Sequence, residues 1–142
     1  MAQVTNFFVG ANSGEGFRNL FSEMVDLADT YDFLVLKGGP GVGKNTFMRE
    51  IGRCAEEAGL AVEYLWCSGD PDSLDGVVIP ELRSAVADGT SPHGSVSKGR
   101  AGTVNRYVYI HAVPSMRGFC ENMKEGSSVS KPRRPAGFFQ NP

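Results

Sequence analysis

The feature that most constrains the fold is the stretch of residues 36–47, which reads LKGGPGVGKNTF. It contains the spacing G-x-x-x-x-G-K, and it lies between a short apolar run and a segment with helical spacing. Glycines at these positions let the backbone turn successive N–H groups inward, toward phosphate oxygens at a helix N-terminus. The stretch therefore predicts a phosphate-binding loop. The alternative is a plain glycine turn between a strand and a helix.

The segments on either side of the loop predict a βαβ unit. Residues 33–36 form a continuous apolar run, as in a strand that is buried on both faces. Residues 46–59 carry apolar side chains at three-to-four spacing and end in a glycine. Residues 60–67 are rich in β-branched and aromatic residues, as strands are. We therefore expect an α/β fold of the P-loop NTPase type, a three-layer parallel sheet with helices on both faces, here incomplete.

Four further segments carry weaker signals. Residues 17–29 have the spacing of an amphipathic helix, and residues 104–113 resemble a strand. Residues 77–80 (VVIP) and 84–89 (SAVADG) are short apolar stretches that follow a turn-rich segment. The chain thus offers fewer strands than a P-loop core commonly has. We expect an open sheet edge that favours self-association.

Charge divides the chain at His93. Residues 1–93 hold 14 acidic and 6 basic side chains, a net charge of −8, whereas residues 94–142 hold 2 acidic and 8 basic ones, a net charge of +6. The last segment is rich in Ser, Pro, Gly and Arg, a composition that builds little core. We expect residues 1–93 to belong to the P-loop domain and residues 94–142 to form a divergent, basic and poorly ordered tail.

Composition excludes several classes of protein. Apolar residues make up 41% and charged residues 21% of the chain, and no apolar run approaches the ~20 residues that a membrane span needs. The N-terminus lacks a basic region followed by an apolar core, and the three cysteines show no metal-ligand spacing. We therefore expect a cytoplasmic protein without a membrane partner. The basic cluster of Lys131, Arg133 and Arg134 has no aromatic platform, so no specific nucleic-acid signal is present.

The loop residues have expected roles in binding a nucleoside triphosphate. Lys44 supplies a charge for the β and γ phosphates and is the expected catalytic residue. Thr46 is expected to face the α phosphate, and backbone N–H groups hold the others. The expected nucleotide-binding residues are Gly38, Gly39, Pro40, Gly41, Val42, Gly43, Lys44, Asn45 and Thr46.

Asn45 departs from the motif, which has Ser or Thr there to coordinate Mg²⁺. An amide oxygen can ligate a hard cation, but Asn is longer than Ser, and octahedral Mg²⁺ tolerates misplacement poorly. Asn45 and Asp88, at the end of SAVADG, are the candidate metal-associated residues. The alternative for Asp88 is an Asp-Gly turn. We expect ATP and Mg²⁺ as ligands, with binding better preserved than hydrolysis.

Other polar residues have a structural explanation that we favour. Asp70, Asp72 and Asp75 could form an acidic rim near the phosphates, but Asp-Pro and Asp-Gly pairs are more often turn residues. The remaining candidates are expected to be packing or surface residues: Tyr64, Trp66, Cys67, His93 and His111.

Three stretches together resemble a family of uncharacterised bacterial P-loop ATPases found in Firmicutes and related anaerobes. They are FFVGANSGEGF, LKGGPGVGKNTFMREIG and EYLWCSGDPDSLDGVVIPELRSAVADGTSPH, and the resemblance covers residues 7–93. Members carry two similar P-loop halves and are more than twice as long. The resemblance implies ATP binding at a loop of the form G-G-P-G-T/V-G-K-S-T. Its positions match Gly38, Gly39, Gly41, Gly43, Lys44 and Thr46, but not Asn45.

The chain matches only part of the first half of that family. The second half is absent and the segment after His93 departs from the family pattern, so we expect a truncated or frame-shifted copy. The favoured function is ATP binding by an ATPase-type P-loop protein with impaired hydrolysis. Two alternatives stay open: a P-loop kinase of a small molecule or nucleotide, and a non-catalytic nucleotide-binding remnant.

Overall fold

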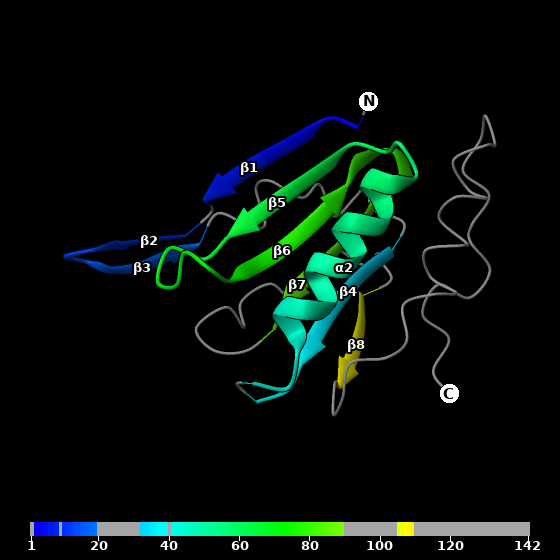
Figure 1. Ribbon diagram of the computed structural model, residues 1–142. Helices are drawn as coiled ribbons and strands as arrows, with labels where there is room; N and C mark the ends of the chain where they lie inside the picture. Colours follow the sequence, from blue (N-terminus) through cyan, green and yellow to red (C-terminus); the bar gives the residue numbers. More distant parts are fainter. Residues whose placement is uncertain (1, 9, 20–31, 40, 90–104, 110–142) are drawn as a thin grey trace.

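The computed structural model describes residues 2–8, 10–19, 32–39, 41–89 and 105–109 of the chain (Figure 1). These residues form a mixed α/β domain with a main sheet, a small hairpin and one α-helix. In chain order the elements are β1 (Val4–Phe8), β2 (Gly10–Ser13), β3 (Gly16–Asn19), β4 (Asp32–Lys37), α2 (Lys44–Glu57), β5 (Val62–Trp66), β6 (Leu74–Ile79), the 3₁₀ helix η1 (Pro80–Leu82), β7 (Ser84–Asp88) and β8 (Asn105–Tyr109).

The main sheet has six strands in the order β1-β5-β6-β7-β4-β8. Only β6 runs against the others, because it is antiparallel to β5 and to β7 while the other neighbouring pairs are parallel. The prediction of a wholly parallel sheet is therefore wrong for β6. The connections give the reason. Residues 67–73 and 80–83 are too few for the crossover that parallel neighbours require, whereas antiparallel strands accept short links.

β4 lies inside the sheet, between β7 and β8, as its apolar sequence predicts. Phe33, Leu34, Val35 and Leu36 are each at most 2% exposed. Leu34 and Leu36 belong to the hydrophobic cluster under α2, while Phe33 and Val35 belong to a second cluster, on the opposite face. The continuous apolar run is thus explained by burial on both faces of one strand.

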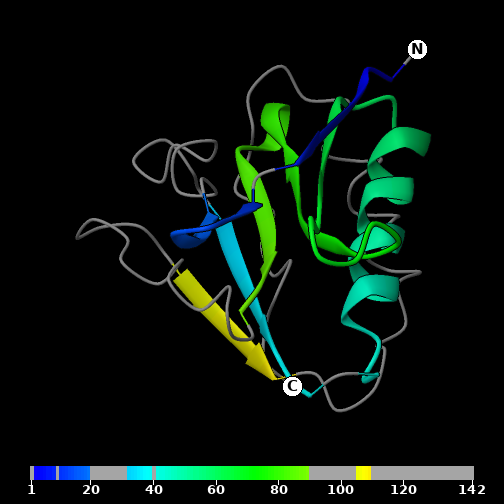
Figure 2. The ribbon, with the colours of Figure 1, turned by 90° about the vertical axis from the view of Figure 1, so that its left-hand side faces the viewer.

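α2 covers one face of the sheet, chiefly over β6 and also against β5 and β7 (Figure 2). Its C-terminus has the predicted glycine stop. Gly59 has a φ of 79°, and the N–H groups of Gly59 and Leu60 donate to the carbonyls of Glu56 and Ala55, which is a Schellman arrangement. The predicted helix is confirmed. Its buried apolar side chains are Phe47, Met48, Ile51, Cys54 and Ala55. Helices on both faces of the sheet stay a prediction.

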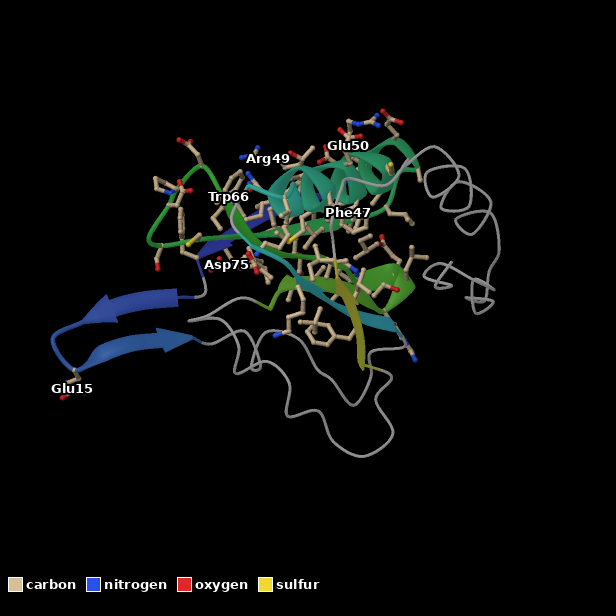
Figure 3. All side chains as sticks on the ribbon, turned by 90° about the horizontal axis from the view of Figure 1, so that it is seen from below. Glu15, Phe47, Arg49, Glu50, Trp66 and Asp75 are labelled. Carbon is tan, nitrogen blue, oxygen red and sulfur yellow. The ribbon has the colours of Figure 1, made fainter. Side chains whose placement is uncertain are left out.

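A two-stranded hairpin, β2–β3, projects from the sheet (blue in Figure 1), with Glu15 at its tip in Figure 3. The strands pair from Gly10↔Asn19 to Ser13↔Gly16 and leave only two residues for the turn. The helix predicted from residue 17 is therefore wrong for residues 17–19, which belong to β3. The glycine-rich turn folds the chain back on itself, and pairing with the preceding strand overrides the helical spacing. Residues 20–29 of that prediction lie outside the described residues.

β1 and β8 are the outer strands of the sheet. β1 pairs in parallel with β5 and has two exposed apolar side chains, Val4 at 43% and Phe8 at 66%. β8 falls within the strand predicted at residues 104–113 and pairs with β4, so part of the segment after His93 joins the sheet. Self-association through a sheet edge and the domain boundary at His93 stay predictions. Residues 110–142 lie outside the described residues.

Candidate functional site

The loop between β4 and α2 contains two glycines in the left-handed backbone region. Gly41 and Gly43 have φ values of 78° and 98°, in the left-handed region that favours glycine, and Gly43 is the N-cap of α2. A Cβ at Gly41 would meet no atom within 4 Å, so backbone conformation, and not lack of space, selects glycine there. Pro40 lies outside the described residues, and Val42 packs against the core. The loop leads directly into a helix N-terminus, where N–H groups have no partner within the helix.

Lys44 is the first residue of α2, and its side chain contacts both the glycine loop and the end of β7. Its Nζ donates to the carbonyl oxygen of Gly38 at 2.9 Å and forms an ion pair with Asp88 Oδ1 at 3.2 Å. The side chains of Lys44 and Asp88 are only 9% and 18% exposed, so water screens their attraction weakly. The structure thus brings together three predicted site residues, from the loop, from α2 and from β7.

Asp88 reaches Lys44 because β7 lies beside β4 in register. Leu36 pairs with Asp88, and the N–H of Gly89 donates to the carbonyl of Leu36 at 2.8 Å. Lys37 Nζ in turn donates to the carbonyl of Gly89 at 2.5 Å. The Asp-Gly pair therefore continues the contact with β4 as far as Gly89. Residues 90 and 91 lie outside the described residues, so the alternative of an Asp-Gly turn stays a prediction.

The side-chain amide of Asn45 forms two hydrogen bonds with the segment that leads into β6. Its Nδ2 donates to the carbonyl of Asp72 at 3.3 Å, and its Oδ1 accepts the N–H of Leu74 at 3.1 Å. Thr46, the next residue, is exposed. The Asn45 contacts were not predicted, because nothing in the motif indicates that residues 72–74 return to the start of α2.

The acidic residues before β6 have structural roles. Asp70 Oδ1 accepts the N–H of Asp72 and its Oδ2 accepts the hydroxyl of Ser73, an Asx-type turn as the favoured interpretation predicts. Asp75 belongs to β6 and is 5% exposed, so it is not part of an exposed acidic rim. Burial raises the pKa of the Cys67 thiol, and the Asp75 charge adds to the increase. Cys67 is therefore poorly suited to act as a nucleophile.

A cavity of about 340 Å³ lies between α2 and the strands β1 and β5. Trp66 Nε1 donates to Asn6 Oδ1 at 2.7 Å, and the Arg49 guanidinium lies 5.1 Å from the centre of the Trp66 ring system (Figure 3). The loop of residues 38–43, Lys44 and Asp88 do not line this cavity. It was missed because β1 was not recognised as a strand. The lining residues are Val4, Asn6, Arg49, Glu50, Arg53, Tyr64, Trp66 and Leu74.

Tyr64 has a packing role beside this cavity. Its hydroxyl donates to Glu56, and its ring occupies the space where a Cβ on Gly52 of α2 would lie. Burial, followed by the hydrogen bond and the charge of Glu56, raises the pKa of Tyr64. The phenol is therefore neutral at physiological pH. These contacts support its interpretation as a strand residue packed against a helix.

The other candidates add no second site in the described part of the chain. His93, His111 and the basic cluster of Lys131, Arg133 and Arg134 lie outside the described residues. Among the residues that are described, no three His, Cys, Asp or Glu side chains are grouped so as to hold a metal ion. Cys54 is fully buried on α2.

Within the described residues, no helix has the length and apolar character that a membrane crossing requires. Comparisons with protein-family models, with curated proteins and with solved structures found no match to this chain.

Proposed function

We propose that this chain binds a nucleoside triphosphate, with its phosphates in the loop of residues 38–46 and ATP as the expected ligand. One observation carries the proposal. Lys44 stands at the start of α2, after two left-handed glycines, with its Nζ between the Gly38 carbonyl and the Asp88 carboxylate. A lysine at this position can exchange its protein partners for phosphate oxygens, and the left-handed glycines before it support a turn of the backbone toward them.

Three sources of positive potential support anion binding at this loop. The ammonium of Lys44 is one, and the N-terminus of α2 is another, equivalent to about half an elementary charge. Backbone N–H groups of the loop are the third. The first turn of α2 contains no acidic residue that would oppose an anion. Asp88 does oppose it, so a phosphate has to compete with this carboxylate for Lys44.

The proposal includes the P-loop NTPase fold for the domain. The parallel strands β4 and β7 end beside the loop, and ligands of open α/β sheets bind at the carboxyl ends of such strands. The contacts of Asn45 favour a protein that binds nucleotide over one that hydrolyses it rapidly, because the residue at this position normally helps to hold the metal for phosphoryl transfer.

Competition binding tests whether the phosphates are what the protein recognises. We expect ATP and inorganic triphosphate to displace a fluorescent ATP analogue, and adenosine to leave it bound, because the loop offers N–H groups and a lysine to phosphate alone. Asn6→Ala alters the separate cavity between α2, β1 and β5, and serves as a control with unchanged displacement. Displacement by adenosine but not by triphosphate would contradict the proposal.

A further inference from the structure

We infer that nucleotide binding at this loop does not depend on Mg²⁺, because Asn45 holds the segment before β6 and is not a metal ligand. The inference rests on the proposed function. It adds that the protein binds the polyphosphate of the nucleotide and holds no cation with it. In this interpretation Asn45 stabilises the segment that leads into β6, which explains why the chain has Asn and not Ser at this position.

The side-chain amide of Asn45 bridges two backbone groups that are two residues apart. Nδ2 donates to the carbonyl of Asp72 at 3.3 Å while Oδ1 accepts the N–H of Leu74 at 3.1 Å. Arg49, one turn further along the same face of α2, also donates to the carbonyl of Asp72. Two side chains from the first turns of α2, Asn45 and Arg49, therefore hold the backbone that leads into β6. A serine hydroxyl can both donate and accept, but its oxygen lies one bond closer to the backbone than the polar atoms of Asn, so we expect it to fall short of these two groups.

The residues present do not fit a resident Mg²⁺. The ion demands near-ideal octahedral placement of its oxygen ligands. Asn45 Oδ1 accepts the N–H of Leu74 and Nδ2 donates to the carbonyl of Asp72, so these two hydrogen bonds fix the orientation of the amide. Turning Oδ1 to meet the geometry of an octahedral ion would weaken both bonds. Asp88 Oδ1 lies 3.2 Å from Lys44 Nζ.

Positive charge for the phosphates then comes from the protein alone. Lys44 and the N-terminus of α2 are present whether or not a cation accompanies the nucleotide. Phosphoryl transfer relies on metal ions to neutralise charge that develops on the phosphates. A loop that binds the phosphates without a metal therefore suits nucleotide binding better than turnover.

Titration of the full chain with ATP, in MgCl₂ and in EDTA, tests this inference. We expect the Kd of the native protein to differ by less than about tenfold between the two buffers. Asn45→Ser restores the motif, and we expect its Kd to rise by more than about tenfold when EDTA replaces MgCl₂. A native Kd that rises as steeply in EDTA would overturn the inference and leave nucleotide binding standing. No ATP binding in either buffer would overturn both.

Hydrogen exchange at the Leu74 amide tests the Asn45 contact without any nucleotide. We expect exchange about 2- to 10-fold faster in Asn45→Ser than in the native protein, because one hydrogen bond is lost. Asn45→Asp keeps an acceptor oxygen at the same place and is the matched control, with exchange like that of the native chain. Unchanged exchange in Asn45→Ser would overturn the inference whatever the ATP titrations show.

Discussion

Lys44→Met is expected to weaken ATP binding by about 10- to 100-fold, since a hydrogen bond to a charged group contributes about 1.5–3 kcal/mol. Methionine keeps the apolar stem of the side chain and removes the ammonium that contacts Gly38 and Asp88. Isothermal titration calorimetry of both proteins with ATP measures the change. Arg53→Met is the matched control, because it removes a positive charge from an exposed site on the same helix. We expect it to leave the Kd near the native value.

The other side of the same ion pair gives the opposite prediction. Asp88→Asn removes the carboxylate that lies 3.2 Å from Lys44 Nζ and that competes with phosphate for it. ATP affinity should therefore rise in this variant, because the like charge facing the phosphates is gone. A clear loss of affinity in Asp88→Asn would show that the carboxylate assists the nucleotide, which this account does not predict.

Gly89→Ala is expected to destabilise the fold by about 1–3 kcal/mol, the usual cost of inserting a methyl group into a packed site. A Cβ at Gly89 would lie 2.4 Å from Val35 Cγ1, 3.0 Å from Lys37 Cε and 3.1 Å from the carbonyl oxygen of Leu36. Val35 is only 2% exposed and has little room to move. Urea unfolding of the native and variant chains measures the difference in the free energy of unfolding.

Two further variants separate this overlap from a general effect of replacing glycine. A Cβ at Gly14, in the β2–β3 turn, would meet no atom within 4 Å, so Gly14→Ala should leave stability nearly unchanged. Val35→Ala removes the closest atom, and Gly89→Ala should therefore cost less in that background than in the native chain. Equal costs in both backgrounds would mean that the contact with Val35 is not the cause.

The central βαβ elements of this chain were predictable because their signals are local. β4 is an unbroken apolar run, and α2 combines three-to-four spacing with a glycine at its C-terminus. Each signal is contained within one element and needs no knowledge of its neighbours. The glycine loop is local in the same sense, which is why the positions of Gly41, Gly43 and Lys44 follow directly from the motif.

Both errors in the fold prediction concern how one strand pairs with another, which the pattern within a single segment does not reveal. Residues 17–19 have helical spacing but pair with β2, because a short turn brings the preceding strand back beside them. β6 runs antiparallel because its links to β5 and β7 are short, and the sequence signal of a strand carries no direction.

The candidate site was predictable in part for the same reason. Asp88 was identified by its place at the end of an apolar stretch, yet its contact with Lys44 depends on the register of β7 against β4. The contacts of Asn45 depend on the return of residues 72–74 to α2, 27 and 29 residues along the chain. Such long-range juxtapositions arise from tertiary packing and leave no periodic trace in the sequence.

The most direct test of nucleotide binding at this loop follows the backbone amides of the isotope-labelled chain by NMR while ATP is added. We predict the largest chemical-shift changes at the amides of Gly39, Gly41, Gly43 and Lys44, because these N–H groups lie at the loop and at the N-terminus of α2. Changes centred instead on Asn6, Tyr64 and Trp66 would place the ligand in the separate cavity. That result, or the absence of any change, would contradict the account.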